Sequence, residues 1–312
     1  MRYHKIDTRL FVENRQRLSE YLLPNSVVIL LSNDRMPTNA DGILPFKQNS
    51  NLFYLTGIDQ EDSFLVFAPD HPNEKMRTQL FLKETNAHIA VWQGHKLSKS
   101  EGTALSGIEE IHWSSKFETS LKEVLTQCDR VYLYQNEHIR ADTKVQMANE
   151  RFTQKLKNDY ALHQFKRLAP LLYDLRMIKS DVEIDLIKEA CRITELGFRS
   201  VLPFVRPDIW EFEVEAEYSY HFLRNRATGF AYEPIIAGGA NTCTLHYTVN
   251  DQKLKSGDLL LMDVGANYGN YNADMTRTIP INGKFSARQK QIYNAVLRVK
   301  NGATDLLRPG CL

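Results

Sequence analysis

The chain has few of the features that mark secreted, membrane-spanning or nucleic-acid-binding proteins. Its 312 residues include only four cysteines, none in a C-x-x-C pair, so the sequence indicates neither a disulfide framework nor a zinc knuckle. No apolar run approaches the roughly 18 residues of a membrane span. A formal net charge of +1 gives no reason to expect nucleic acid or an anionic membrane as a partner. Residues 1–12 lack an apolar core of signal-peptide length, so we expect a cytoplasmic protein.

The most informative residues are two aspartates, Asp263 and Asp274, on either side of a predicted β-hairpin. An apolar run at 259–262 enters the hairpin, a turn rich in Gly, Asn and Tyr follows, and a Thr-rich run leaves it. If the loop is Tyr268-Gly269, Asp263 lies directly opposite Asp274, with Cβ atoms roughly 4.5–5.5 Å apart. Two carboxylates this close repel each other unless a cation lies between them, and all-oxygen ligands suit Mn²⁺ or Mg²⁺. Aspartates beside a turn are also common where no metal binds, so both interpretations stay open.

The chain is predicted to divide near residue 172. Before this point, short runs of β-branched and aromatic residues alternate with helical stretches, which indicates a domain built on a mixed α/β sheet. The predicted strands are 27–31, 64–68, 80–82 and 131–134, and the predicted helices are 9–22 and 117–125. The polar segment 149–172 favours a linker helix.

After residue 172 the pattern changes to amphipathic helices and a block of strands. Ser180 with Glu183 forms a capping-box pattern at the start of one helix, and Ser286 with Gln289 forms another at the start of the last helix. Residues 235–279 are predicted to hold the strands between them.

A second helix in this part is predicted to begin with Asp208 and Glu211 as its cap. Four glutamates alternate along it: Glu211, Glu213, Glu215 and Glu217. Because this spacing spreads them around the helix surface, we expect them to be solvated rather than to bind a metal.

The segments around the two aspartates resemble aminopeptidase P, a pita-bread metallopeptidase with prolidase, methionine aminopeptidase and creatinase as relatives. The matching segments are 239–247, 257–265 and 272–278, and in the first half of the chain 41–42, 48–57 and 91–97. The motifs appear in the family's order over nearly the whole chain. The resemblance implies an α/β (α+β) fold: a creatinase-like mixed-sheet domain at residues 1–172, then the first half of a pita-bread metallopeptidase domain at 173–312.

The resemblance also implies roles for individual residues. Asp263 matches the first metal-binding aspartate, and Asp274 matches the aspartate that bridges two metal ions. His246 matches the histidine of the substrate pocket, placed to hydrogen-bond the peptide during catalysis. Tyr232 corresponds to a tyrosine that lines the pocket. In similar enzymes the N-terminal domain packs near a neighbouring active site, so the resemblance implies that Trp92, where exposed, lines a substrate channel.

Two of these residues also have a structural interpretation. His246 lies between Leu245 and Tyr247, and from the residues alone we favour a structural histidine that bonds the backbone. The family resemblance reverses this preference. For Trp92, a strand tryptophan in a local core is the expectation that we favour.

One departure from the family stands out. The family's two-metal site uses two aspartates, one histidine and two glutamates, and the last three come from the second half of the fold. The 38 residues that follow Asp274 (312 − 274) contain neither histidine nor glutamate. We therefore expect a fragment of a longer enzyme, truncated before the second half of the catalytic domain, and we expect this chain to be inactive.

For the intact enzyme, the resemblance implies metal-dependent hydrolysis of the N-terminal Xaa-Pro peptide bond. The implied cofactors are two divalent metal ions, with Mn²⁺ expected. The implied partners are peptides with proline at the second position and further copies of the chain in a dimer or tetramer. Two alternatives stay open: a prolidase-type dipeptidase, and a non-catalytic module for binding or oligomerisation.

Overall fold

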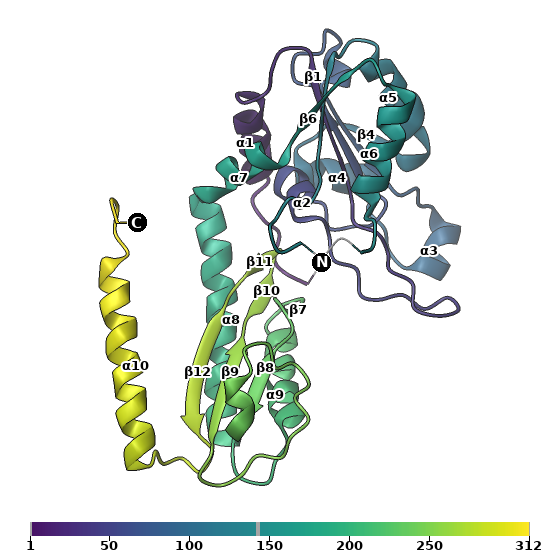
Figure 1. The fold of residues 1–312 in the computed structure, drawn as a ribbon. Coiled ribbons are helices and arrows are strands. Elements are labelled where there is room, and N and C mark those ends of the chain that lie inside the picture. Colours follow the sequence, from purple (N-terminus) through teal and green to yellow (C-terminus); the bar gives the residue numbers. More distant parts are fainter. Residues whose placement is uncertain (1, 142–143, 312) are drawn as a thin grey trace. The chain divides into compact units, whose positions relative to one another are not determined.

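The computed structural model describes residues 2–141 and 144–311 and divides the chain into two compact units (Figure 1). Unit 1 comprises Tyr3–Ile184 and unit 2 comprises Asp185–Leu312. The predicted boundary at residue 172 falls inside α7 (Ala169–Met177), where Leu172 and Leu175 belong to the core of unit 1. The predicted mixed α/β class is confirmed.

Unit 1 is built on one six-stranded sheet with the strand order β4-β3-β2-β1-β5-β6. Its strands are β1 (Ser26–Leu31), β2 (Phe64–Phe67), β3 (Thr78–Leu82), β4 (Glu110–Trp113), β5 (Arg130–Leu133) and β6 (Gln164–Arg167). β2 runs antiparallel to β1 and β3, whereas β5 runs parallel to β1 and β6, and β4 runs parallel to β3. All six residues of β1 are buried, so both faces of the sheet are covered.

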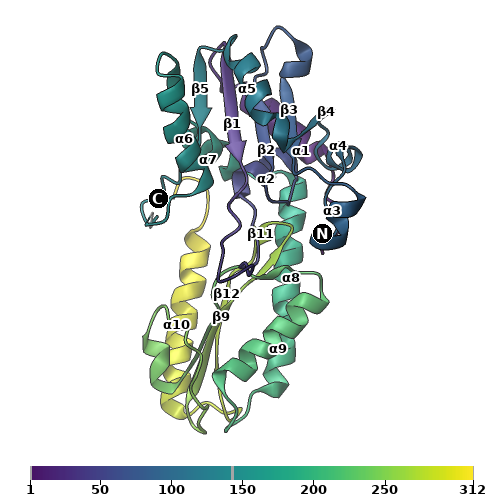
Figure 2. The ribbon, with the colours of Figure 1, turned by 90° about the vertical axis from the view of Figure 1, so that its right-hand side faces the viewer.

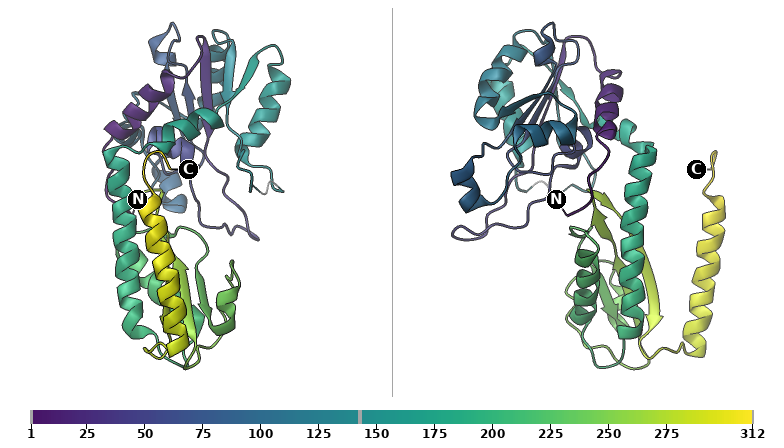
Figure 3. Two further views of the ribbon diagram at one scale, coloured as in Figure 1. Left: turned by 60° about the vertical axis from the view of Figure 1, so that its left-hand side comes forward. Right: turned by 180° about the vertical axis from the view of Figure 1, so that it is seen from behind.

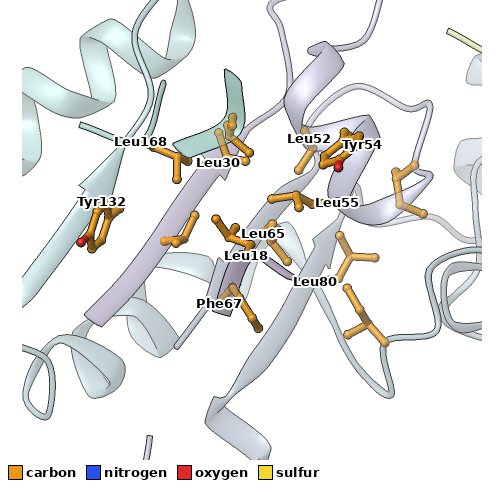
Figure 4. Close-up of a cluster of buried hydrophobic side chains, with 14 of the residues drawn as sticks. Leu18, Leu30, Leu52, Tyr54, Leu55, Leu65, Phe67, Leu80, Tyr132 and Leu168 are labelled. Atoms are coloured by element: carbon orange, nitrogen blue, oxygen red, sulfur yellow. The ribbon is translucent and has the colours of Figure 1, made fainter. Parts of the chain in front are cut away.

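Helices on the two faces enclose separate apolar cores. Val28 and Leu30 face one core, which includes Leu18 of α1 and Leu55 of α2 (Figure 4). Val27 and Ile29 face the other, which is closed by α5 and α6. The helices of this unit are α1 (Arg9–Ser19), α2 (Ser50–Thr56), α3 (Ala87–Gln93), α4 (Lys99–Ser106), α5 (Phe117–Leu125), α6 (Ala148–Asp159) and α7, with the short 3-10 helices η1 (Glu74–Met76) and η2 (Ser114–Lys116).

The predicted linker helix at 149–172 is wrong, because this segment contains α6, β6 and the start of α7. β6 pairs with β5 from Gln164 to Arg167 at the edge of the sheet. Only Phe165 of this strand packs against a core. An edge strand of polar residues is stabilised by its backbone hydrogen bonds, and the sequence shows no apolar alternation from which it could be predicted.

Unit 2 combines two three-stranded sheets with most of α8 (Asp181–Phe204), which begins in unit 1, and with α9 (Glu211–Arg224) and α10 (Ala287–Leu306). One sheet has the order β12-β9-β8 and the other the order β11-β10-β7. The strands are β7 (Gly229–Phe230), β8 (Ile235–Gly238), β9 (Leu259–Val264), β10 (Ala266–Tyr268), β11 (Tyr271–Asn272) and β12 (Met275–Pro280), with the 3-10 helix η3 (Gly239–Cys243) after β8. Figure 2 shows α9 and α10 on opposite sides of the β8–β9–β12 strands.

The two predicted capping boxes are confirmed. Glu183 accepts a hydrogen bond from the backbone N of Ser180, and Gln289 accepts one from the backbone N of Ser286. The predicted Asp208–Glu211 cap is wrong. α9 starts with Trp210 as its N-cap, and Glu213 accepts the hydrogen bond from the backbone N of Trp210.

The last helix, α10, has no buried side chain and lies apart from α8 and the strands (Figure 3). Within the described ranges, no helix is both long enough and apolar enough to cross a bilayer.

Candidate metal centre and active site

The two predicted metal ligands lie on a hairpin whose register differs from the predicted one. The loop is Gly269-Asn270, with φ of +55° and +66°, and not Tyr268-Gly269. A two-residue turn of this kind needs positive φ at both positions, which Gly and Asn tolerate and a buried tyrosine does not. Asp263 therefore pairs with Thr276, and the predicted pairing of Asp263 directly opposite Asp274 is wrong.

The error is a shift of two residues, which leaves every side chain on its predicted face. Along β9, Leu260, Met262 and Val264 are buried, whereas Asp263 lies on the alternate, half-exposed face. The hydroxyl of Tyr218 on α9 contacts the sulfur of Met262 at 3.6 Å, so the buried face is the one turned toward α9.

Gly265 joins β9 to β10 where the facing arm of the hairpin, at Ala273, approaches closely. A Cβ atom on this residue would lie 1.8 Å from the carbonyl oxygen of Ala273, so only glycine fits. The carbonyl oxygen of Gly265 accepts a hydrogen bond from the backbone N of Ala231 at 2.8 Å. This bond fixes the residue before Tyr232 beside the hairpin.

Tyr232 brings the two carboxylates to a common point. Its hydroxyl lies 2.6 Å from Oδ1 of Asp263 and 3.0 Å from Oδ1 of Asp274. A phenol carries one proton and donates it to one carboxylate at a time. Burial and the two neighbouring carboxylates raise the pKa of Tyr232 far above its ordinary value, so the hydroxyl stays protonated.

His246 lies in the exposed segment between η3 and β9. Its ring makes no hydrogen bond with any residue in the described part of the chain, which disfavours a histidine held by the backbone. No hydrogen bond or ion pair among the described residues joins His246 to the two carboxylates. The structure thus brings Tyr232, Asp263 and Asp274 together and leaves His246 on a separate loop.

Trp92 lies on α3 of unit 1, and 80% of its surface is exposed. The favoured expectation of a strand tryptophan in a local core is therefore wrong. No residue of α3 is buried, and the chain that follows it is fixed by a hydrogen bond from the backbone N of Leu97 to Gln60 and by the 2.6 Å ion pair of Lys96 with Glu61.

Glu211 is the residue of this region whose placement the sequence did not reveal. It was expected to be solvated, but its side chain is completely buried at the start of α9. The alternation of four glutamates gave no signal that distinguished Glu211 from the others.

The carboxylate oxygens of the hairpin are of the type that binds a hard divalent cation, but they are only two groups. Asp263 and Asp274 present carboxylate oxygens to one point, and oxygen ligands suit Mn²⁺ or Mg²⁺. Across residues 2–141 and 144–311, no group of three or more His, Cys, Asp or Glu side chains is placed to hold a metal ion. The described residues therefore place two carboxylate groups, those of Asp263 and Asp274, beside one hydroxyl group.

Comparison with known proteins covers nearly the whole chain. Residues 11–134 match the family "Aminopeptidase P, N-terminal domain", and residues 185–312 match "Metallopeptidase family M24". The chain is 34% identical over 306 residues to the Xaa-Pro aminopeptidase of Haemophilus influenzae, covering 98% of this chain and 68% of that protein. It is 30% identical over 307 residues to the Xaa-Pro aminopeptidase of Escherichia coli, covering 98% and 69%.

Solved structures give the same result. The aminopeptidase PepP of Pseudomonas aeruginosa superposes with a TM-score of 0.89 at 28% identity, over 98% of this chain and 69% of that one. A putative aminopeptidase P from Bacillus anthracis superposes with a TM-score of 0.87 at 31% identity, over 94% and 70%. The two family matches, the sequence identity and the superpositions agree with the motif resemblance, and the chain belongs to the aminopeptidase P family of M24 metallopeptidases, which have the pita-bread fold.

Proposed function

We propose that Asp263 and Asp274 bind divalent metal ions, with Mn²⁺ as the expected metal, for hydrolysis of the N-terminal Xaa-Pro bond of peptides. The observation that supports this role is the convergence of both carboxylates on the hydroxyl of Tyr232. The M24 family uses divalent metal ions, so a pair of carboxylates held at one point is the expected part of its site. A bound divalent ion lowers the pKa of a coordinated water and polarises the carbonyl of the bond that is cut.

The residues of this chain have three tasks in the proposal. Asp263 and Asp274 hold the ions, and Tyr232 orients both carboxylates through its hydroxyl. His246 donates a hydrogen bond to the carbonyl oxygen of the peptide, where negative charge develops during attack. Its exposed ring, free of hydrogen bonds to the described residues, is compatible with this task.

Specificity for proline is the second part of the proposal. A structure of the Escherichia coli relative contains the inhibitor Pro-Leu, which has proline at its start. A pocket for Xaa-Pro must accept a tertiary amide that has no N–H and a fixed φ. We propose that Tyr232 lines this pocket. We further propose that the exposed Trp92 contacts substrate beside the active site of another copy in a dimer or tetramer.

Metal binding tests the role of the two carboxylates directly. We expect Mn²⁺ to bind this chain weakly, because the described residues supply only two carboxylates, and to broaden NMR signals of Asp263, Asp274 and Tyr232. Asp263→Asn or Asp274→Asn should each weaken binding by at least about 10-fold. Asp305→Asn, on the unburied helix α10, is the matched control and should bind as the wild type does. Broadening away from the hairpin, or unchanged binding by both Asn variants, would contradict the assignment.

Peptide hydrolysis tests the specificity. The purified chain is incubated with Mn²⁺ and either Xaa-Pro dipeptides or Xaa-Pro-Xaa tripeptides, and the released amino acid is measured. We expect no turnover by these 312 residues, since the two aspartates alone leave the metal site incomplete. Cleavage of tripeptides would refute the expected inactivity and support the aminopeptidase, whereas cleavage of dipeptides alone would support the prolidase alternative.

A further inference from the structure

Glu211 is a fully buried carboxylate without a cationic partner. Glu211 has 0% exposed surface, and no lysine, arginine or histidine of the described residues forms an ion pair with it. A buried charge costs free energy unless hydrogen bonds replace the lost water. The arrangement around Glu211 therefore has to supply strong donors.

Four donors surround the two carboxylate oxygens. Oε1 accepts from the backbone N of Gly238 at 2.7 Å and from Nδ2 of Asn241 at 3.2 Å. Oε2 accepts from the hydroxyl of Tyr247 at 2.7 Å and from the backbone N of Gln252 at 2.9 Å. Hydrogen bonds to a charged acceptor are about twice as strong as neutral ones. Glu211 thus joins the end of β8 and three points of the chain between β8 and β9 to the start of α9.

These donors enclose the segment that carries His246. Asn241 precedes His246 and Tyr247 follows it directly, so both sides of the exposed loop are tied to one carboxylate. The ring of His246 makes no hydrogen bond to the described residues, so its position depends on the backbone on either side. Burial and the neighbouring Glu211 raise the pKa of Tyr247 to about 12, which keeps its hydroxyl a donor at neutral pH.

We propose that Glu211 is the positioning residue that orders the 239–252 segment and thereby places His246. Glu211 acts through the loop and touches neither the substrate nor the Asp263–Asp274 pair. The proposal rests on the role given to His246 above, but the order of the loop can be measured without any catalytic activity.

A carboxylate is required at this position rather than an amide. Each oxygen of Glu211 accepts two hydrogen bonds, so an NH₂ group in place of either oxygen would face two donors. Glu211→Gln keeps the size of the side chain and removes this acceptor pattern, which makes it the sharpest test. Glu217→Gln removes one charge from the same helix away from the loop and is the matched control.

The order of the loop can be measured by NMR of the full chain, with isotope labels in its histidine and tyrosine rings, and by amide hydrogen exchange. We expect one sharp set of His246 ring signals in the wild type and in Glu217→Gln, and broadened or multiple signals in Glu211→Gln. The amides of Gly238 and Gln252 should exchange at least about 10-fold faster in Glu211→Gln, as expected for loss of a bond to a charged group. The ionisation of Tyr247 should move from about 12 toward the ordinary tyrosine value of about 10.

Tyr247→Phe provides a milder variant, because it removes one of the four donors and leaves the carboxylate in place. It should broaden the His246 signals less than Glu211→Gln does. Unchanged His246 signals and amide exchange in both variants, with only a lower melting temperature, would overturn the proposal. Loss of His246 order supports it whether or not the wild type binds Mn²⁺, since Mn²⁺ binding tests the carboxylates of the hairpin alone.

Discussion

Gly265→Ala should lower the free energy of unfolding of unit 2 by about 4 kcal/mol or more, among the largest effects expected of a single substitution. The added Cβ would lie 1.8 Å from the carbonyl oxygen and 2.6 Å from the carbonyl carbon of Ala273. Both are backbone atoms of the facing arm, which is fixed by the hydrogen bond from the backbone N of Ala273 to the oxygen of Ala266. A flexible side chain could move away from the new methyl group, whereas this backbone cannot without breaking the hairpin.

Chemical denaturation followed by tryptophan fluorescence and by NMR of unit 2 measures the effect. Gly302→Ala in α10 is the control, because apart from the neighbouring residues and the backbone of the helix itself no atom lies within 4 Å of the added methyl group there. This substitution should leave stability unchanged or raise it by up to about 1 kcal/mol, since alanine favours a helix more than glycine does. A Gly265→Ala chain with the stability of the wild type would show that the two arms of the hairpin lie farther apart than described.

Asn250→Ala should cost about 3 kcal/mol or more of the stability of unit 2, because Asn250 is 2% exposed and uses its whole amide. Its Oδ1 accepts from the backbone N of Ile236 at 3.0 Å. Its Nδ2 donates to Oε2 of Glu215 at 2.9 Å and to the carbonyl oxygen of Pro234 at 3.0 Å. Alanine would leave these three groups without their partner, and it would also occupy a φ of +51° that asparagine tolerates better.

Asn250→Gly separates the two contributions. Glycine adopts the positive φ freely and lacks the amide, so it removes the hydrogen bonds without the backbone strain. In urea denaturation, the free energy of unfolding of Asn250→Gly should be about 1 kcal/mol higher than that of Asn250→Ala and well below that of the wild type. Equal stability of Asn250→Gly and the wild type would show that the amide contributes nothing.

The features that could be predicted from the sequence depend on residue preferences and on interactions between residues a few positions apart. The capping boxes at Ser180 and Ser286 depend on residues three positions apart, and both helices start there. The β-branched and aromatic runs at 27–31 and 64–68 became central strands of a mixed sheet, because burial on both faces selects such residues.

The features that were missed depend on contacts between distant segments. β6 exists because β5 offers it an unpaired edge, although its own residues are mostly polar. Tryptophan is a residue type that favours buried strands. Trp92 nevertheless lies exposed on the short helix α3, which has no buried residue. Periodicity within a window of sequence carries no information about such neighbours.

The candidate site divides in the same way. The sequence by itself determined that Asp263 and Asp274 face the same side of a hairpin, since alternation along a strand is a local rule. Only the tertiary structure decided the register, through the positive φ values at Gly269 and Asn270, and brought the hydroxyl of Tyr232 between the carboxylates. The burial of Glu211 also follows only from the tertiary structure, because burial is set by what packs against a residue and not by the residue itself.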